Sequence, residues 1–306
     1  MRPAWSVLLL TTLIGAGQGL FLAAFAADLL LRAERQFVLA GAVIPLVLLS
    51  AGLTASFFHL GHPERAWRSA AMWRTSWLSR EVIVLPALMA VVFAWGAAHY
   101  LGVSRGTTLS LGMAGTLLAA ALFVCTGMIY ACLPFLQEWR TPLTIVNFTL
   151  LGCASGLSAA AALAALLQPS LARAYALAAL VVGAAAYLGR LAALWRNARL
   201  RPKSTLASAI GVKHPKIVQI AQGAMGGSFN TREFFHGRPR EVVRAARWAL
   251  LALVFPVPAL LLILFMNSPT GLSAAFLLQY AGLLAERWYF FAEAKHPQNL
   301  YYQAIS

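Results

Sequence analysis

Eight long apolar stretches limit the possible folds of this chain more than any other feature. A helix that crosses a bilayer core of about 30 Å needs roughly 20 apolar residues, and each stretch supplies such a window. A water-soluble domain with 60% hydrophobic and only 11% charged residues would expose large apolar patches. We therefore expect an all-α integral membrane protein, an eight-helix transmembrane bundle, with windows at residues 5–31, 38–59, 82–101, 107–132, 142–167, 174–195, 246–267 and 271–291.

Helices are expected rather than barrel strands, because the windows lack the alternating ten-residue pattern of a lipid-facing strand. The first window also resembles a secretory signal, but its apolar run continues to Leu31, which favours a first transmembrane helix. Gly15 and Gly19 within it predict close packing against a neighbouring helix. We treat residues 1–306 as a single membrane-anchor domain.

The formal charge of +15 indicates topology rather than nucleic-acid binding, because the basic residues lie between the windows. With eight helices, nineteen of the 24 basic residues fall on the side of the N-terminus, four fall opposite, and Arg190 lies inside a window. Positively charged loops remain in the cytoplasm. Both termini are thus predicted to be cytoplasmic, in a bacterial inner membrane.

The basic loop at about 196–243 is the longest predicted connection. It mixes arginine and lysine with exposed apolar residues, so it could lie on membrane lipid. Its turn at 228–236 combines aromatic and hydrogen-bonding side chains, which favours a protein partner.

Metal cofactors within the chain are not expected. Cys125, Cys132 and Cys153 form no Cys-x-x-Cys pair, which argues against an iron-sulfur cluster. All six histidines lie near helix ends or in connections, and His59 and His99 should lie on opposite sides of the membrane. We therefore predict no haem, no iron-sulfur cluster and no molybdenum in this chain.

The connection after the second window is the candidate functional site. Histidine and arginine at the mouth of a membrane bundle are unfavourable unless they have a role. His59 can exchange protons near neutral pH, Arg65 can stabilise negative charge on a reduced carbonyl, and Trp67 offers a flat apolar surface. Glu81 could share in proton transfer. These groups would suit a quinone. The alternative is purely structural: a histidine that caps a helix and an arginine that holds the membrane interface.

This connection resembles the loop between helices 2 and 3 of the dimethyl sulfoxide (DMSO) reductase membrane-anchor family, whose length and layout are similar across the whole chain. The matching residues are His59, Leu60, Gly61, Pro63, Arg65, Ala66, Arg74, Leu78, Ser79 and Glu81.

The resemblance implies a subunit that anchors a molybdopterin catalytic subunit and a four-cluster iron-sulfur subunit, and that exchanges electrons with ubiquinone or menaquinone. The quinone pocket it implies involves His59, Gly61, Arg65, Trp67 and Ser69.

We expect electrons to run from sulfite to quinone, and a menaquinol-oxidising anchor of a DMSO reductase-type complex is the alternative. Anchors of respiratory reductases oxidise menaquinol and hold their catalytic subunits outside the cytoplasm, whereas the charge asymmetry here places the loop inside. The turn at 228–236 and the tail at 287–291 are similar to those in anchors of cytoplasm-facing sulfite-oxidising molybdoenzymes. A transporter is the alternative of another class, although mid-helix polar residues are few.

Overall fold

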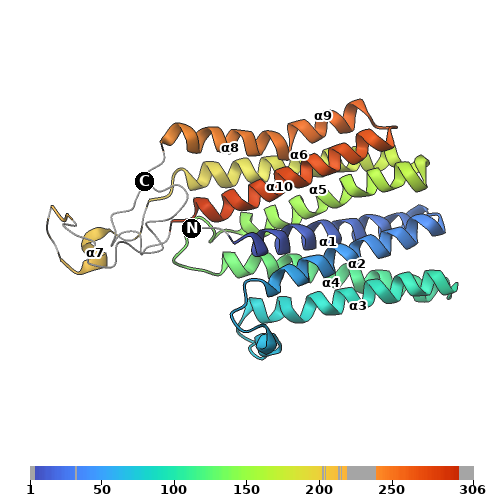
Figure 1. Cartoon of the computed structure of the whole chain (residues 1–306), viewed down its shortest axis with the longest axis horizontal. Coiled ribbons are helices and arrows are strands. Elements are labelled where there is room, and N and C mark those ends of the chain that lie inside the picture. Colours follow the sequence, from blue (N-terminus) through green and yellow to red (C-terminus); the bar gives the residue numbers. More distant parts are fainter. Residues whose placement is uncertain are drawn as a thin grey trace.

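The computed structural model describes residues 4–31, 33–201, 203, 205–212, 214, 216–218 and 239–295, apart from the side chains of residues 209 and 240. These residues form helices and connections, with no strand among them. The long helices lie side by side in one elongated bundle (Figure 1). They are α1 (Trp5–Leu31), α2 (Arg35–Phe57), α3 (Trp77–Leu101), α4 (Arg105–Ala131), α5 (Pro142–Leu167), α6 (Pro169–Asn197), α8 (Arg240–Val254), α9 (Pro256–Leu264) and α10 (Pro269–Glu293).

The bundle has two distinct ends. At one end, which we call the loop face, α1 begins, α10 ends, and a 3-10 helix η1 (Pro63–Ala70) and the short α7 (Leu206–Ile210) lie outside the bundle (Figure 1). At the other end, the far face, tight turns join α1 to α2, α3 to α4, α5 to α6 and α9 to α10. The first and last long helices therefore have their outer ends on the same side.

Seven helical segments in the described part of the chain are long and apolar enough to cross a membrane. They are α1 to α6 and the segment Glu241–Leu264, which contains most of α8 together with α9. The 25-residue helix α10 is not among them, and it carries Glu286, Arg287 and Glu293 near its end. The expected all-α membrane architecture is confirmed in this region, while a count of eight spans is not.

Glycine allows α1 and α5 to pack with their backbones in contact. A Cβ atom added to Gly19 would lie 2.2 Å from the carbonyl oxygen of Gly152, and one on Gly156 would lie 2.1 Å from the carbonyl carbon of Gly19. Such distances leave no room for any side chain, so these positions require glycine. The Gly15-x-x-x-Gly19 pair thus lies at a close helix contact, as expected.

The window expected at 246–267 is two helices rather than one. Pro256 has no backbone N–H, and a proline within a helix therefore interrupts its hydrogen bonds. Here α8 ends at Val254, Phe255 has a φ of −118° and a ψ of −74°, and α9 begins at Pro256. The span is therefore kinked at Phe255.

Candidate functional site

The sequence predicted a site in the connection between α2 and α3. The expected window ended at His59. In the structure, α2 ends at Phe57, and His59 lies in the turn beyond it. Pro63 starts η1, where its missing N–H is harmless. Glu64 then accepts a hydrogen bond from His62 Nδ1 at 3.0 Å and lies 3.6 Å from Arg65 Nε. The second histidine and Arg65 are thereby linked through one exposed carboxylate.

Gly61, a member of the implied quinone pocket, lies in the turn between α2 and η1. Its φ is not in the left-handed region, and an added Cβ would meet no atom within 4 Å. The fold of this turn therefore does not require glycine at position 61. If glycine is needed there, the reason must be the approach of another molecule.

Arg80 fixes the second half of the connection. Its Nε donates to the carbonyl oxygen of Trp73 at 2.9 Å, and its Nη2 donates to that of Arg74 at 2.8 Å. Its guanidinium also lies 4.2 Å from the ring centroid of Trp77. Ser76 caps the start of α3 by accepting from the backbone N–H of Ser79. These bonds hold the turn before α3 against the helix that carries Glu81.

Glu81 is the buried member of the predicted site. It lies in the second turn of α3, is only 6% exposed, and accepts a hydrogen bond from the hydroxyl of Thr126 on α4. Because a carboxylate is unfavourable inside a membrane bundle without a partner, its position directly below the loop face marks it as a functional candidate.

The other predicted residues are exposed, except for Ser69, which is half-buried. Trp67 is 72% exposed, and the side chains of His59 and Arg65 also face outward. The Ser69 hydroxyl donates to the carbonyl oxygen of Ala66 within η1. Among the described residues, no hydrogen bond or ion pair joins His59 or Arg65 to Glu81. The loop face thus holds these groups on neighbouring elements without enclosing them in one cavity.

Around them lies an exposed apolar surface at the loop face. Phe58 follows α2, Met72 and Trp73 precede α3, and Leu78 lies in its first turn, and each is more than half exposed. Arg68 and Arg74 lie over the rings of Trp67 and Trp73, with 5.4 Å from guanidinium carbon to ring centroid in both. This surface can contact lipid or a protein partner.

A buried ionic cluster near the loop face was missed by the sequence analysis. Arg190 on α6 lies 2.9 Å from Glu286 and 3.6 Å from Glu293, both on α10. Arg287 lies 3.4 Å from Glu286, and its guanidinium packs 3.5 Å from the ring centroid of Phe148. Arg287 was expected in a basic tail, but it is buried in α10 because Glu286 and the aromatic ring compensate its charge.

The aromatic residues of the 287–291 segment also form part of the interior. Phe290 and Phe291 pack on Tyr130, Phe148 and Trp139, and the indole Nε1 of Trp139 donates to the carbonyl oxygen of Phe290 at 3.0 Å. The segment therefore closes the loop end of the α4, α5 and α10 interface. In the sequence, the only signal for the buried ionic cluster was the presence of Glu286 and Arg287 inside the apolar window at 271–291.

A second missed cluster lies at the far face. Asp28, at the end of α1, is buried and accepts hydrogen bonds from His99 Nε2 at 3.1 Å and from Arg105. Arg105 also donates to the carbonyl oxygen of Asp28. The cluster ties the ends of α1 and α3 to the start of α4. It accounts for His99, which lies at the opposite end of the bundle from His59.

Metal ligation has no obvious location in this part of the chain. No group of three histidine, cysteine or acidic residues that could hold a metal ion occurs among the described residues. Cys125 is buried, while Cys132 is exposed at the end of α4. The turn at 228–236 lies outside the described residues.

This helical bundle, with its polar loop face, belongs to a known class of membrane subunit. The chain matches the family of the DMSO reductase anchor subunit (DmsC) over residues 1–302, and it is a member of that family. It is also 54% identical, over the full length of both chains, to the C subunit of the sulfite dehydrogenase of Allochromatium vinosum. The resemblance inferred from the residues of the loop is thereby confirmed.

Family membership defines the general role. The chain is a multi-pass membrane anchor of a molybdoenzyme oxidoreductase complex, whose catalytic and iron-sulfur subunits are its partners. Family membership therefore favours an anchor subunit over a transporter, which was the alternative that the sequence composition allowed.

Proposed function

We propose that this anchor passes electrons from an iron-sulfur subunit docked at the loop face to a quinone bound at the connection between α2 and α3. The observation that carries the proposal is the arrangement of this connection. It presents His59, Arg65 and Trp67 at the mouth of the bundle while Glu81 is buried in the second turn of the adjoining helix.

The residues present fit a quinone. An exposed indole and neighbouring apolar side chains offer a flat, water-excluding surface for the ring. His59 and Arg65 carry hydrogen-bond donors for a carbonyl oxygen. Arg65 is also paired with the exposed Glu64 at 3.6 Å through its Nε. Gly61 leaves open space beside them. Ser69 is a weaker candidate because its hydroxyl is already engaged within η1.

The bound quinone would supply the two-electron chemistry, taking up two electrons and two protons to give the quinol. His59 is positioned to exchange a proton with water at the loop face. Glu81, held by Thr126, is positioned to exchange the other from inside the bundle. Arg65 would stabilise negative charge on the oxygen before protonation.

The electron donor we propose is sulfite. The relative from Allochromatium vinosum is part of a sulfite dehydrogenase, and the match extends over the whole chain. Oxidation of sulfite with one water gives sulfate, two protons and two electrons, which balances the reduction of one quinone. The strongly basic side favours a complex that faces the cytoplasm of a bacterial inner membrane. We further propose that α10 is an eighth span, which places both termini inside, and that residues 1–306 form one domain.

The test is turnover of the complete complex in membranes. His59→Ala or Arg65→Ala should reduce sulfite-dependent quinone reduction by about tenfold or more. Sulfite oxidation with an artificial soluble acceptor should remain, because the catalytic subunit is untouched. Unchanged quinone reduction in both variants would contradict the proposed site.

Two matched controls lie in the same connection. His62 is as exposed as its neighbours and pairs with Glu64, and Arg68 lies one turn from Arg65. His62→Ala and Arg68→Ala should retain quinone reduction if the role belongs to the two named residues. Quinol-driven reduction of a sulfoxide, without activity toward sulfite, would instead favour a reductase running in the opposite direction.

A further inference from the structure

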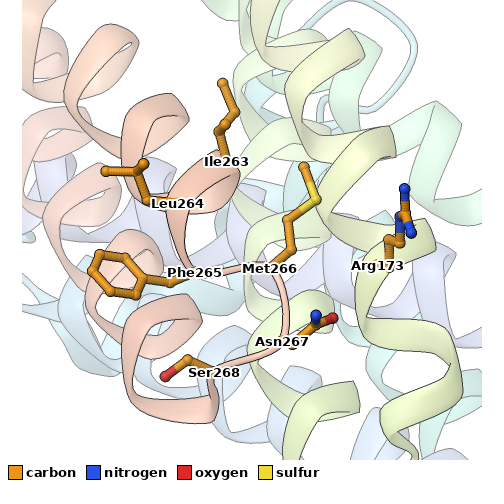
Figure 2. Close-up of a pocket in the computed structure, with 7 residues that line it drawn as sticks. All are labelled: Arg173, Ile263, Leu264, Phe265, Met266, Asn267 and Ser268. Carbon is orange, nitrogen blue, oxygen red and sulfur yellow. The ribbon is translucent and has the colours of Figure 1, made fainter.

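A groove opens at the far face, between α6 and the turn that joins α9 to α10. Its volume is about 450 Å³, within the range of small-molecule sites. Arg173 lines it from α6, and the consecutive residues 263–268 line it from the other side. Figure 2 shows Arg173 on one helix, facing Met266 and Asn267 across the opening.

One part of the groove is apolar and faces outward from the bundle. Ile263, Leu264 and Phe265 are 55%, 62% and 43% exposed. They occupy the last turn of α9 and the residue after it, at the far-face end of the candidate membrane span Glu241–Leu264. This wall is therefore suited to an acyl chain rather than to water.

The other part is polar. The hydroxyl of Ser268 is already engaged, because it caps α10 by accepting from the backbone N–H of Gly271 at 3.2 Å. Arg173 and Asn267 retain their donors. Arg173 is the fifth residue of α6, so it lies about 6 Å along the helix axis from its start, at the depth of lipid headgroups.

Arg173 differs from the other far-face arginines that the structure describes. Arg35 donates to the carbonyl oxygen of Tyr100, and Arg105 pairs with Asp28. Arg173 has no ion pair or hydrogen bond with any described residue. A guanidinium at the edge of hydrocarbon favours an anionic partner, and its geometry suits a phosphate.

We propose that this groove binds an anionic glycerophospholipid from the leaflet at the far face. The phosphate accepts hydrogen bonds from Arg173 and Asn267, and an acyl chain runs along Ile263 and Leu264. The site lies at the opposite end of the bundle from the proposed quinone site and does not depend on it. Bound there, the lipid bridges α6 and the α9–α10 turn.

The test uses the full-length chain reconstituted in vesicles of phosphatidylcholine with a minor fraction of phosphatidylglycerol, followed by native mass spectrometry. Wild-type protein should retain phosphatidylglycerol in preference to phosphatidylcholine. Arg173→Gln should lower that retention roughly tenfold or more, because a charge-assisted hydrogen bond is lost. Arg173→Lys should preserve part of it, and Arg35→Gln, at the same face but outside the groove, should leave it unchanged.

Arg173 is exposed, so its replacement should leave the bundle folded, and unchanged helicity and elution volume would verify this. Equal retention by wild type and Arg173→Gln would overturn the proposal, as would equal retention of the two lipids. Displacement of the lipid by added inorganic phosphate would indicate a simple anion site and would also overturn it.

Discussion

At the scale of single residues, the proposed site has one buried member, Glu81, and several exposed ones. Its carboxylate is inside the bundle and accepts a hydrogen bond from Thr126 on the neighbouring helix. His59 and Arg65 lie outside, in the solvent-facing connection. In the proposed site, proton exchange with the quinone would thus involve groups in two different environments.

Glu81→Gln should reduce sulfite-dependent quinone reduction by about 100-fold or more, because the amide keeps the size of the side chain but cannot transfer the proton. Activity with the artificial acceptor should persist. Thr126→Val should produce a smaller loss, and Thr126→Ser should retain activity because the hydroxyl remains. Normal quinone reduction in Glu81→Gln membranes would remove Glu81 from the proposed site.

At the scale of helices, two kinds of contact hold the bundle together. α1 and α5 meet through glycines whose backbones touch, so dispersion forces act over a very short separation. α6 and α10 are joined instead by the ion pair between Arg190 and Glu286, whose side chains are both almost fully buried. The α1–α5 contact should therefore be destabilised by any larger side chain at its glycines, and the Arg190–Glu286 contact by the loss of either charge.

Gly156→Ala should destabilise the bundle, since its Cβ would lie 2.1 Å from the carbonyl carbon of Gly19 and force α1 and α5 apart. We expect a loss of about 1–3 kcal/mol, typical of overpacking, measured as a lower thermal midpoint of the purified chain. Gly183→Ala on α6 is the control, because a Cβ there meets no atom within 4 Å. Similar midpoints for the two variants would show that the helices do not approach so closely.

Removing one member of the buried pair should destabilise more than removing both. Arg190→Leu or Glu286→Leu alone leaves one unbalanced charge in the buried cluster that also contains Arg287 and Glu293, with a loss of about 3–5 kcal/mol. The double variant should recover part of that loss, because Arg287 and Glu293 then leave the cluster with no net charge and two leucines can pack against each other. A double-mutant cycle on denaturant unfolding measures the coupling, and strictly additive losses would contradict the pairing.

At the scale of the whole molecule, the two ends of the bundle have different chemistry. The loop face carries η1 outside the bundle, while the far face consists of short turns (Figure 1). Aromatic and basic side chains are exposed on η1, whereas the far face has the buried Asp28 cluster. This asymmetry matches a membrane anchor that meets its partner subunits on one side only. Labelling of a native cysteine can measure on which side of the membrane the loop face lies.

Cys132 is exposed at the loop-face end of α4, while Cys125 is buried. A membrane-impermeant maleimide should therefore label the chain in inverted vesicles and not in right-side-out vesicles, if the loop face is cytoplasmic. Cys132→Ser should abolish this labelling. Labelling from the outside would reverse the proposed orientation, and with it the argument for a cytoplasmic catalytic subunit.

The sequence alone determined the all-α membrane class and the family, but not the number of spans. Long apolar windows define membrane helices because the bilayer admits little else. The motif around His59 identified the anchor family because its residues are close together along the chain. Boundaries agreed closely for the windows at 5–31 and 142–167, which match α1 and α5.

The tertiary structure decided which distant residues meet. Arg190 and Glu286 are nearly 100 positions apart, and Asp28, His99 and Arg105 come from three helices, so no local pattern reveals their pairing. The same is true of Thr126 beside Glu81, and of the groove that holds Arg173. Hydropathy records how apolar each helix is, but the direction in which each polar side chain points depends on how the helices pack.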